Sequence, residues 1–210
     1  MTILRKAEHR ALSNIELGGK VVDLGGDVRS DYLAIIKGKR DLTVVNMDPK
    51  TKPDVIADLE EQLPLPNGSY DGALLINVLE HVYRYRELLT ETARILKPGG
   101  TVLIVVPYML PYHPSPRDFH RFSSEALTRH LADTGFTDIR VTPLGSGVFA
   151  ARYLFLERLL PGALQDLLGL VCHPLAALFD ALFSGLASSL RKSYQRTDYA
   201  LGFAIEAHKA

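Results

Sequence analysis

The chain has 210 residues, of which 24 are basic and 24 acidic, so its formal net charge is zero. Without excess positive charge it lacks the long-range field that attracts polyanions, and we expect no nucleic-acid partner. The single cysteine, Cys172, excludes an internal disulfide framework and any multi-cysteine zinc site. A chain with one cysteine is typical of a protein in a reducing compartment. Because residues 1–19 contain no apolar core of signal-peptide length, the predicted location is the cytoplasm.

Helix and strand patterns alternate along the first two thirds of the chain. Apolar residues at four-residue spacing predict a covering helix over Thr2–Leu17. Helices are also predicted at Arg84–Leu96, ended by LysProGlyGly, and at about Ser124–Thr134, opened by a pair of serines and closed by Gly135. Short apolar runs bounded by turn residues predict five parallel strands covered on both faces: Val21–Leu24, Leu42–Met47, Asp54–Ala57, Gly72–Ile76 and Val102–Val106. This alternation is typical of a doubly wound α/β sheet.

After Phe136 the pattern changes. Thr137–Thr142 and Tyr199–Ala207 alternate as strands do, and residues 148–192 between them are rich in Leu, Ala and Phe at helical spacing. We therefore predict one domain over residues 1–210, with a helical insertion over 148–192 before the last strand.

The insertion has two interpretations. Its longest charge-free run, from Asp166 to Asp180, is shorter than the roughly 20 residues of a bilayer-spanning helix, so no transmembrane span is predicted. The first interpretation is a lid or homodimer face packed on the core. The second is an amphipathic element in peripheral contact with a membrane, with three basic residues near the headgroups: Arg191, Lys192 and Arg196.

Ligands of open α/β sheets bind beyond the carboxyl ends of the strands. Gly25 and Gly26 follow the first predicted strand and let a ligand approach the backbone. Asp48 follows the second strand, where a carboxylate can accept hydrogen bonds from both hydroxyls of a ribose. Asp58 and Leu59 follow the third and suit the amino group and ring face of an adenine. These residues predict a site for an adenosine cofactor.

The fourth strand is followed by the segment NVLEHV, which places Asn77, Glu80 and His81 near the far end of that cofactor. His81 suits a catalytic role and, equally, that of a half-buried histidine beside a helix start. The earlier loop residues also have structural interpretations, because glycines make tight turns and Asp48 and Asp58 can cap the turns that follow them.

The loop after the fifth strand, residues 107–122, combines polar and aromatic side chains: Tyr108, Tyr112, His113, Asp118, His120 and Arg121. We predict that His113 or His120 is a general base, that Asp118 orients an imidazole, and that the tyrosines and Arg121 bind the acceptor. In the alternative interpretation Asp118 and Arg121 form a structural pair that fixes the loop. No further Cys or His cluster completes a zinc site, so no metal is predicted.

Four segments carry a family resemblance: VVDLGG, VVNMD, PDVIADLEEQLPLPNGSYDGALLINVLEHV and ARILKPGGTVLIVVP. Over about Val21–Pro107 the chain resembles the class I S-adenosylmethionine-dependent methyltransferases. The resemblance implies a Rossmann-like, mostly parallel seven-stranded sheet whose last strand, TDYALGFAIEAHK, is antiparallel. It also implies S-adenosylmethionine as cofactor. The segment YHPSPRDFHRFSSEALTRHLADTGF is similar to a subgroup associated with cell-envelope and glycoconjugate biosynthesis.

The glycine pattern departs from two cofactor motifs. Counted from Gly25, the dinucleotide fingerprint requires glycines where this chain has Asp27 and Ser30, which disfavours a nicotinamide cofactor. In the acidic-x-Gly-x-Gly pattern of the methyltransferases Asp23 fits as a cofactor-binding residue, but Asp27 replaces the second glycine. Asp27 can meet the cofactor's ammonium, and Arg29 can pair with a nearby aspartate or with the cofactor's carboxylate.

The predicted function is S-adenosylmethionine-dependent methyl transfer to a small-molecule or glycoconjugate acceptor, such as an oxygen of a sugar or lipid-linked metabolite. The alternative is a methyltransferase-like subunit that has lost turnover and serves binding or assembly. Asp27 and Arg29 favour the alternative, whereas Asp48, Asp58 and NVLEHV favour the enzyme.

Overall fold

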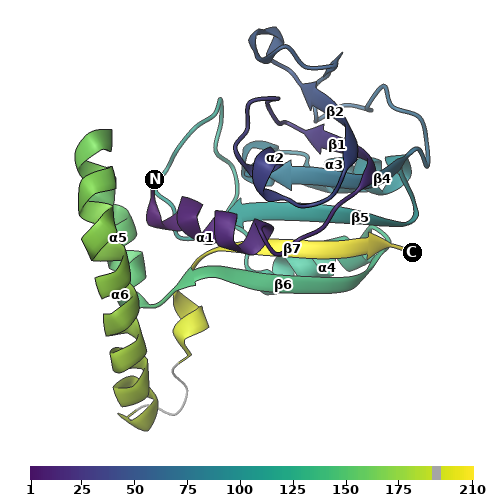
Figure 1. Cartoon of the computed structure of the whole chain (residues 1–210). Helices are drawn as coiled ribbons and strands as arrows, with labels where there is room; N and C mark the ends of the chain where they lie inside the picture. The colour runs from purple at the N-terminus through teal and green to yellow at the C-terminus, as the bar shows by residue number, and fades with distance from the viewer. Residues whose placement is uncertain (191–194) are drawn as a thin grey trace.

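A single mixed sheet organises the protein (Figure 1). The computed structural model describes residues 1–190 and 195–210. Its strands are β1 (Gly19–Leu24), β2 (Arg40–Asn46), β3 (Val55–Ile56), β4 (Tyr70–Ile76), β5 (Leu96–Pro107), β6 (Phe136–Ser146) and β7 (Ala200–Lys209). The order is β3-β2-β1-β4-β5-β7-β6, with β1 to β5 parallel and β7 antiparallel to both of its neighbours. The predicted fold class is confirmed.

Helices cover both faces of the sheet. They are α1 (Ile3–Leu12), α2 (Tyr32–Ile35), α3 (Tyr85–Ile95), α4 (Ser124–Asp133), α5 (Val148–Glu157) and α6 (Gly162–Leu190), with short 3-10 turns η1 (Pro49–Thr51), η2 (Leu79–His81) and η3 (Arg196–Tyr199). Buried residues of α3 and α4 share one core with Val22, whereas α1, α2 and α5 share a second core with Val21. Because successive strand residues point to opposite faces, these β-branched runs are buried on both sides.

The helix boundaries follow from local capping. Thr2 caps α1 and Ser123 caps α4, each accepting a hydrogen bond from a backbone N–H three residues later. The predicted break after α3 takes a different form, because α3 runs directly into β5 and the LysProGlyGly segment lies inside that strand. In the β4–β5 ladder Tyr70 pairs with Leu96 and Gly72 pairs with Thr101. The LysProGlyGly segment, residues 97–100, is therefore an irregularity in this ladder.

Helix α6 is longer than the charge-free run suggested. It continues through Asp166, Pro174 and Asp180 as one helix of 29 residues. Its residues 162–187 are long and apolar enough to cross a membrane by length and composition. The length of the charge-free run therefore no longer argues against a span. Arg191 and Lys192 lie outside the described residues, as does the side chain of Arg196.

Two buried carboxylates attach α5 and α6 to the domain. Asp180 of α6 accepts hydrogen bonds from the backbone N–H groups of Phe149 and Ala150, each 2.9 Å, at the N-terminus of α5. Glu157 of α5 accepts from the N–H of Ile3, at the N-terminus of α1, at 3.0 and 3.1 Å. Both carboxylates favourably meet the positive end of a helix dipole. Figure 1 shows α6 on the side to which the carboxyl ends of β4 and β5 point.

Candidate functional site

A cleft of about 870 Å³ lies at the carboxyl ends of β1, β2 and β4. This volume is within the range typical of small-molecule sites. Its lining includes six of the predicted site residues: Gly25, Asp48, Asp58, Leu59, Asn77 and His81. The sequence thus placed these residues on separate loops, and the fold brings them to one cavity.

The turn after β1 is held by the end of β2. Asn46 Nδ2 donates to the carbonyl oxygens of Gly25 and Gly26, at 3.2 and 2.8 Å, and its Oδ1 accepts from the N–H of Asp48. Gly25 has φ +84°, which favours glycine, and a Cβ there would meet Val78 at 2.9 Å. One amide therefore ties the glycine turn to the loop that carries Asp48.

Asp48 and Asp58 combine a structural contact with a place in the cleft. Asp48 Oδ1 accepts from the N–H of Lys50, and Asp58 Oδ1 accepts from the N–H of Glu60, each at 2.9 Å. The capping interpretation of both residues is therefore correct. A carboxylate has two oxygens, so each residue can cap its turn and still offer an acceptor to a ligand.

Asp23 is not among the residues that line the cleft. Its side chain is fully buried beneath the turn, where it accepts a 2.7 Å hydrogen bond from the Tyr32 hydroxyl. A Cβ on Gly26 would overlap the Asp23 carboxyl group. Burial raises the pKa of Asp23 to about 7, and the Tyr32 hydrogen bond only partly opposes this rise.

The raised pKa of Asp23 predicts that the protein becomes less stable as the pH rises. The folded state binds this proton more tightly than the unfolded state, so the free energy of unfolding falls between pH 4 and pH 7 and the loss is complete above pH 7. Three pKa units correspond to about 4 kcal/mol. We expect Asp23→Asn to gain about 2 to 3 kcal/mol relative to the parent on going from pH 5 to pH 8.5. Urea unfolding at both pH values measures this difference, and parallel pH profiles would contradict it.

Asp27 and Arg29 pair with each other. Arg29 donates from Nε to Asp27 Oδ1 at 2.9 Å and from Nη2 to Oδ2 at 2.5 Å. The Arg29 hydrogen bonds lower the pKa of Asp27 to about 2. Neither residue is among those that line the cleft, while Asp31 pairs instead with Arg5 and His9. The altered loop therefore presents a neutralised pair.

A buried carboxylate and two imidazoles meet at the end of the cleft. Glu80 in η2 has no exposed side-chain surface, and neither of its carboxylate oxygens has a hydrogen-bond partner among the described residues. Glu80 Oε1 is 3.7 Å from His81 Nε2 and 4.0 Å from His113 Nε2. The nearby Glu80 carboxylate is the main cause of a raised His113 pKa. We call these three residues the Glu80 cluster.

The remaining candidates of loop 107–122 are in other contacts. Arg121 donates to both oxygens of Asp118, at 2.5 and 2.7 Å, and to the Leu110 carbonyl, so the two residues form the structural pair. This pairing holds the pKa of Asp118 well below its usual range. His120 stacks near Tyr83 and lies edge-on to Tyr85.

The two tyrosines of this loop are also not among the residues that line the cleft. The Tyr108 ring packs 5.5 Å from Phe203, and Tyr112 is 77% exposed. None of the six predicted residues of this loop is among those that line the cleft, but His113 is in ring contact with His81, which does line it.

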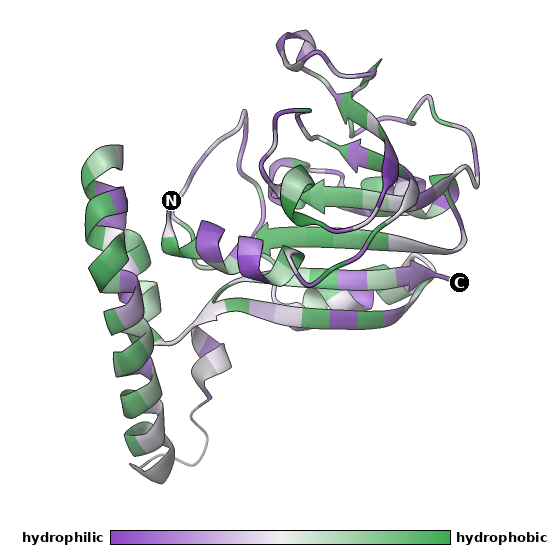
Figure 2. Ribbon diagram, viewed as in Figure 1, coloured by the Kyte–Doolittle hydropathy of each residue, from purple (hydrophilic) through white to green (hydrophobic). Residues whose placement is uncertain are grey.

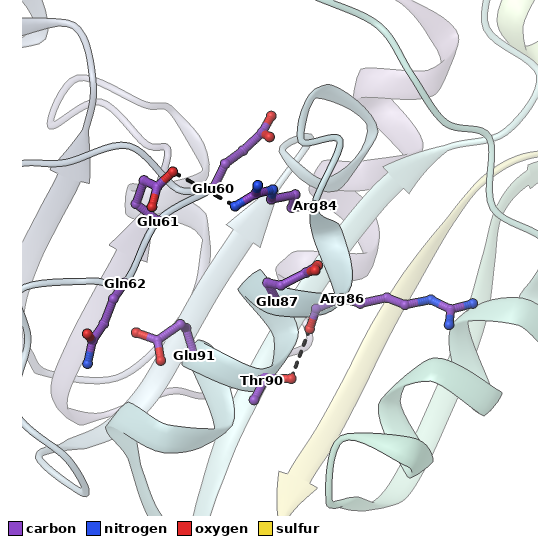
Figure 3. Close-up of a pocket in the computed structure, with 8 residues that line it drawn as sticks. All are labelled: Glu60, Glu61, Gln62, Arg84, Arg86, Glu87, Thr90 and Glu91. Atoms are coloured by element: carbon purple, nitrogen blue, oxygen red, sulfur yellow. Dashed lines mark hydrogen bonds and ion pairs between the residues drawn. The ribbon is translucent and has the colours of Figure 1, made fainter.

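A second hollow of about 570 Å³ is lined by charged side chains between the loop after β3 and α3 (Figure 3). Arg84 approaches Glu61 at 3.9 Å there, and Glu91 pairs with Arg94. Two of the four glutamates that line the hollow are thus paired with arginines. We assign no site to it.

Sequence reasoning missed three features of the site. Glu80 was placed near the cofactor, but the pattern NVLEHV does not show that its carboxylate is fully buried. The role of Asn46 was also missed, although an amide at the end of a strand before Asp48 was a usable signal. Ser115, Pro116 and Arg117 line the cleft as well, and only the path of loop 107–122 reveals this.

Comparisons with known proteins agree with this geometry. A family model described as a methyltransferase domain matches residues 2–141. A probable S-adenosylmethionine-dependent methyltransferase of Mycobacterium tuberculosis is 28% identical over 92 residues, which cover 41% of this chain and 34% of that protein. An O-methyltransferase of Aspergillus sclerotiorum is 31% identical over 96 residues, 41% of this chain and 36% of that protein. The chain spans about a third of the length of the first curated relatives it matches.

The fold has a close counterpart among solved structures. A possible histamine N-methyltransferase of Thermotoga maritima superposes with a TM-score of 0.60 at 16% identity, covering 99% of this chain and 92% of that one. At this identity the likeness concerns the fold alone.

Proposed function

Because the chain belongs to the S-adenosylmethionine-dependent methyltransferase family, we propose that it transfers a methyl group from S-adenosylmethionine to an acceptor oxygen. The acceptor is a small or medium metabolite of the sugar or lipid-linked kind. The observation that carries this proposal is the convergence of Gly25, Asp48, Asp58 and Leu59 in one cleft. The similarity to a fungal O-methyltransferase supports an oxygen as the acceptor atom.

The cleft fits an adenosyl cofactor by the chemistry of its lining. Asp48 offers a carboxylate for the ribose hydroxyls, Asp58 an acceptor for the adenine amino group, and Leu59 an apolar wall for the ring. Gly25 leaves the backbone approachable at the turn between them. When bound, S-adenosylmethionine supplies an activated methyl group.

The chain's own residues align and activate the acceptor. The acceptor oxygen forms a bond to the methyl carbon while the carbon–sulfur bond breaks, and its proton must be removed. We assign the activation of this oxygen to the Glu80 cluster, because His81 lines the cleft and His113 lies against His81. The Asp118–Arg121 pair holds loop 107–122 in place and so positions His113.

In the sequence, Asp27 and Arg29 favoured a non-catalytic subunit, but their geometry in the structure does not support that interpretation. Asp27 and Arg29 neutralise each other and are not among the cleft residues. Calorimetric titration with S-adenosylhomocysteine tests the proposal, and we expect one site with a micromolar Kd together with a thermal shift. Absence of both heat and thermal shift would contradict it.

The apolar face of α6 supports a lipid-linked acceptor. Six apolar residues lie within one stripe at helical spacing and are 38 to 63% exposed: Leu164, Leu168, Val171, Leu175, Leu178 and Leu182. Asp166 and Asp180 fall on the opposite side of the helix by the same spacing. Figure 2 shows how strongly apolar this helix is. We propose that the stripe contacts a lipid surface on the side of the molecule that carries the cleft.

Substitutions on the stripe test this contact. Burying apolar side chains in the membrane interface drives binding, so Val171→Asp/Leu178→Asp is expected to lower binding to phosphatidylethanolamine–phosphatidylglycerol vesicles at least tenfold in co-sedimentation. The matched control is Leu170→Asp, because Leu170 is 69% exposed but lies off the stripe. A parent protein that remains in the supernatant would contradict the proposal, and a dimer in solution would favour the homodimer interpretation.

A further inference from the structure

The Glu80 cluster has an unusual balance of charge and hydrogen bonds. A fully buried carboxylate without a hydrogen-bond partner is costly, because burial removes its hydration without replacement. The Nε2 atoms of His81 and His113 lie 3.7 and 4.0 Å from Glu80 Oε1, which is too far for hydrogen bonds, and the Arg121 cation acts on Glu80 from beyond 4 Å. A cation bound between Glu80 Oε1 and the two Nε2 atoms would offset the cost of burying the carboxylate.

The histidine tautomers are set by the backbone. His81 Nδ1 lies 2.5 Å from the carbonyl oxygen of Arg117, and His113 Nδ1 lies 3.0 Å from that of Pro111. A carbonyl can only accept, so each Nδ1 carries the proton and donates it. In the neutral imidazoles each Nε2 then carries a lone pair, and these two atoms lie 3.7 and 4.0 Å from Glu80 Oε1. Metal-bound histidines are oriented by this same second hydrogen bond.

Arg121 does not overturn this assignment for His113. Its Nη2 lies 3.3 Å from His113 Nδ1, but it already donates to Asp118 Oδ2 at 2.7 Å. The same Nδ1 is 3.4 Å from that Asp118 oxygen, a second acceptor. His113 Nδ1 thus has two acceptors nearby, the Pro111 carbonyl and Asp118 Oδ2, and one donor that is already bonded to Asp118. This arrangement favours a proton on Nδ1.

We propose that Glu80, His81 and His113 bind one divalent transition-metal cation, with Zn²⁺ as the natural probe. One ligand atom from each residue lies within 4.8 Å of the others. Neighbouring ligands of a zinc ion with bonds of about 2.1 Å are about 3.4 Å apart, so a small inward movement completes the site. Two imidazoles and one carboxylate favour zinc, iron or nickel over calcium or magnesium.

The position next to the cleft gives this cation a use. His81 lines the cleft, so a cation held by the three residues would lie beside the proposed acceptor space. A cation there lowers the pKa of an acceptor hydroxyl, whose proton then leaves to solvent. This use rests on the proposed function, whereas the binding itself does not.

Metal titration of tag-free protein tests the inference. With Zn²⁺ we expect one site per chain by calorimetry, and with Co²⁺ a visible absorption band of a protein-bound ion. His113→Ala and Glu80→Gln should each weaken Zn²⁺ binding at least tenfold. His120→Ala is the matched control, because His120 lies on the same loop but in the aromatic contacts, and it should stay within twofold.

Thermal unfolding guards against a variant that fails to fold. Glu80→Gln removes the unpartnered charge while keeping the shape, and its amide can donate to the imidazole lone pairs, so its melting temperature without metal should rise. Zn²⁺ should raise that of the parent and leave that of Glu80→Gln unchanged. Equal Zn²⁺ affinity in parent, Glu80→Gln and His113→Ala, or no binding by the parent at 100-fold excess, would overturn the inference.

The outcomes separate the two proposals. Zn²⁺ binding without S-adenosylhomocysteine binding would leave the metal site standing and contradict the proposed function. If the protein binds no Zn²⁺ and a chelator leaves its methyl transfer unchanged, the proposed function stands and the metal site is contradicted.

Discussion

Replacing His113 by alanine is expected to lower kcat for methyl transfer at least a hundredfold, about 2.7 kcal/mol, with less than a twofold change in the Kd of S-adenosylhomocysteine. The loss follows whether His113 removes the acceptor's proton itself or helps to hold a cation that lowers the pKa of the acceptor hydroxyl. The cofactor contacts are unaffected because Asp48, Asp58 and Leu59 lie on other loops. Single-turnover kinetics with a saturating cofactor, beside calorimetry, measures both quantities.

His120→Ala provides the comparison. Both histidines belong to one loop and were equal candidates from sequence, but His120 packs among Tyr83, Tyr85 and Phe122 and is not part of the Glu80 cluster. We expect its kcat to stay within threefold of the parent. Equal losses in both variants would mean that the loop acts through its conformation, and unchanged turnover in both would remove His113 and His120 from the chemistry.

Asp48→Ala is expected to weaken S-adenosylhomocysteine binding at least tenfold, or about 1.4 kcal/mol. The side chain follows β2 and lines the cleft, where a carboxylate can accept from both ribose hydroxyls. Asp41→Ala is the matched control, since Asp41 is exposed at the opposite end of the same strand. Calorimetry on the three proteins gives the comparison, and an equal Kd in all of them would place the ribose elsewhere.

A second substitution separates binding from turn formation at this position. Asp48 also accepts from the N–H of Lys50, so alanine removes both a ligand contact and a cap. Asp48→Asn keeps an acceptor for the cap but loses the charge. We expect it to unfold at the parent's temperature and to bind the cofactor product more weakly than the parent.

Much of the fold could be predicted from local patterns. Runs such as Val102–Val106 are apolar on every residue because helices cover both faces of the sheet, and this burial is visible as composition. The antiparallel β7 came from the family resemblance, because nothing local distinguishes its direction. The predicted helical insertion contains α5 and α6, but the charge-free run underestimated the apolar length of α6, since a charge count does not reveal that Asp180 turns inward to cap α5.

The cofactor half of the site was more predictable than the acceptor half. Gly25, Asp48 and Asp58 each follow a strand directly, so sheet topology alone brings them together. The Glu80 cluster instead depends on loop 107–122 folding back over η2, where the N–H groups of Phe119 and His120 donate to the Glu80 carbonyl at 2.8 and 3.2 Å. Such a long-range loop contact leaves no periodic trace in the sequence.

The overlap between a side chain at position 26 and the Asp23 carboxyl group makes these two positions a coupled pair. Any mutation that adds a Cβ at Gly26 must displace the buried acid, because the three atoms that this Cβ would meet first all belong to the Asp23 carboxyl group. Their substitution costs should therefore be strongly non-additive. In descendants of this sequence a smaller residue at 23 must therefore precede or accompany any side chain at 26, so the order of mutations constrains how this turn diverges.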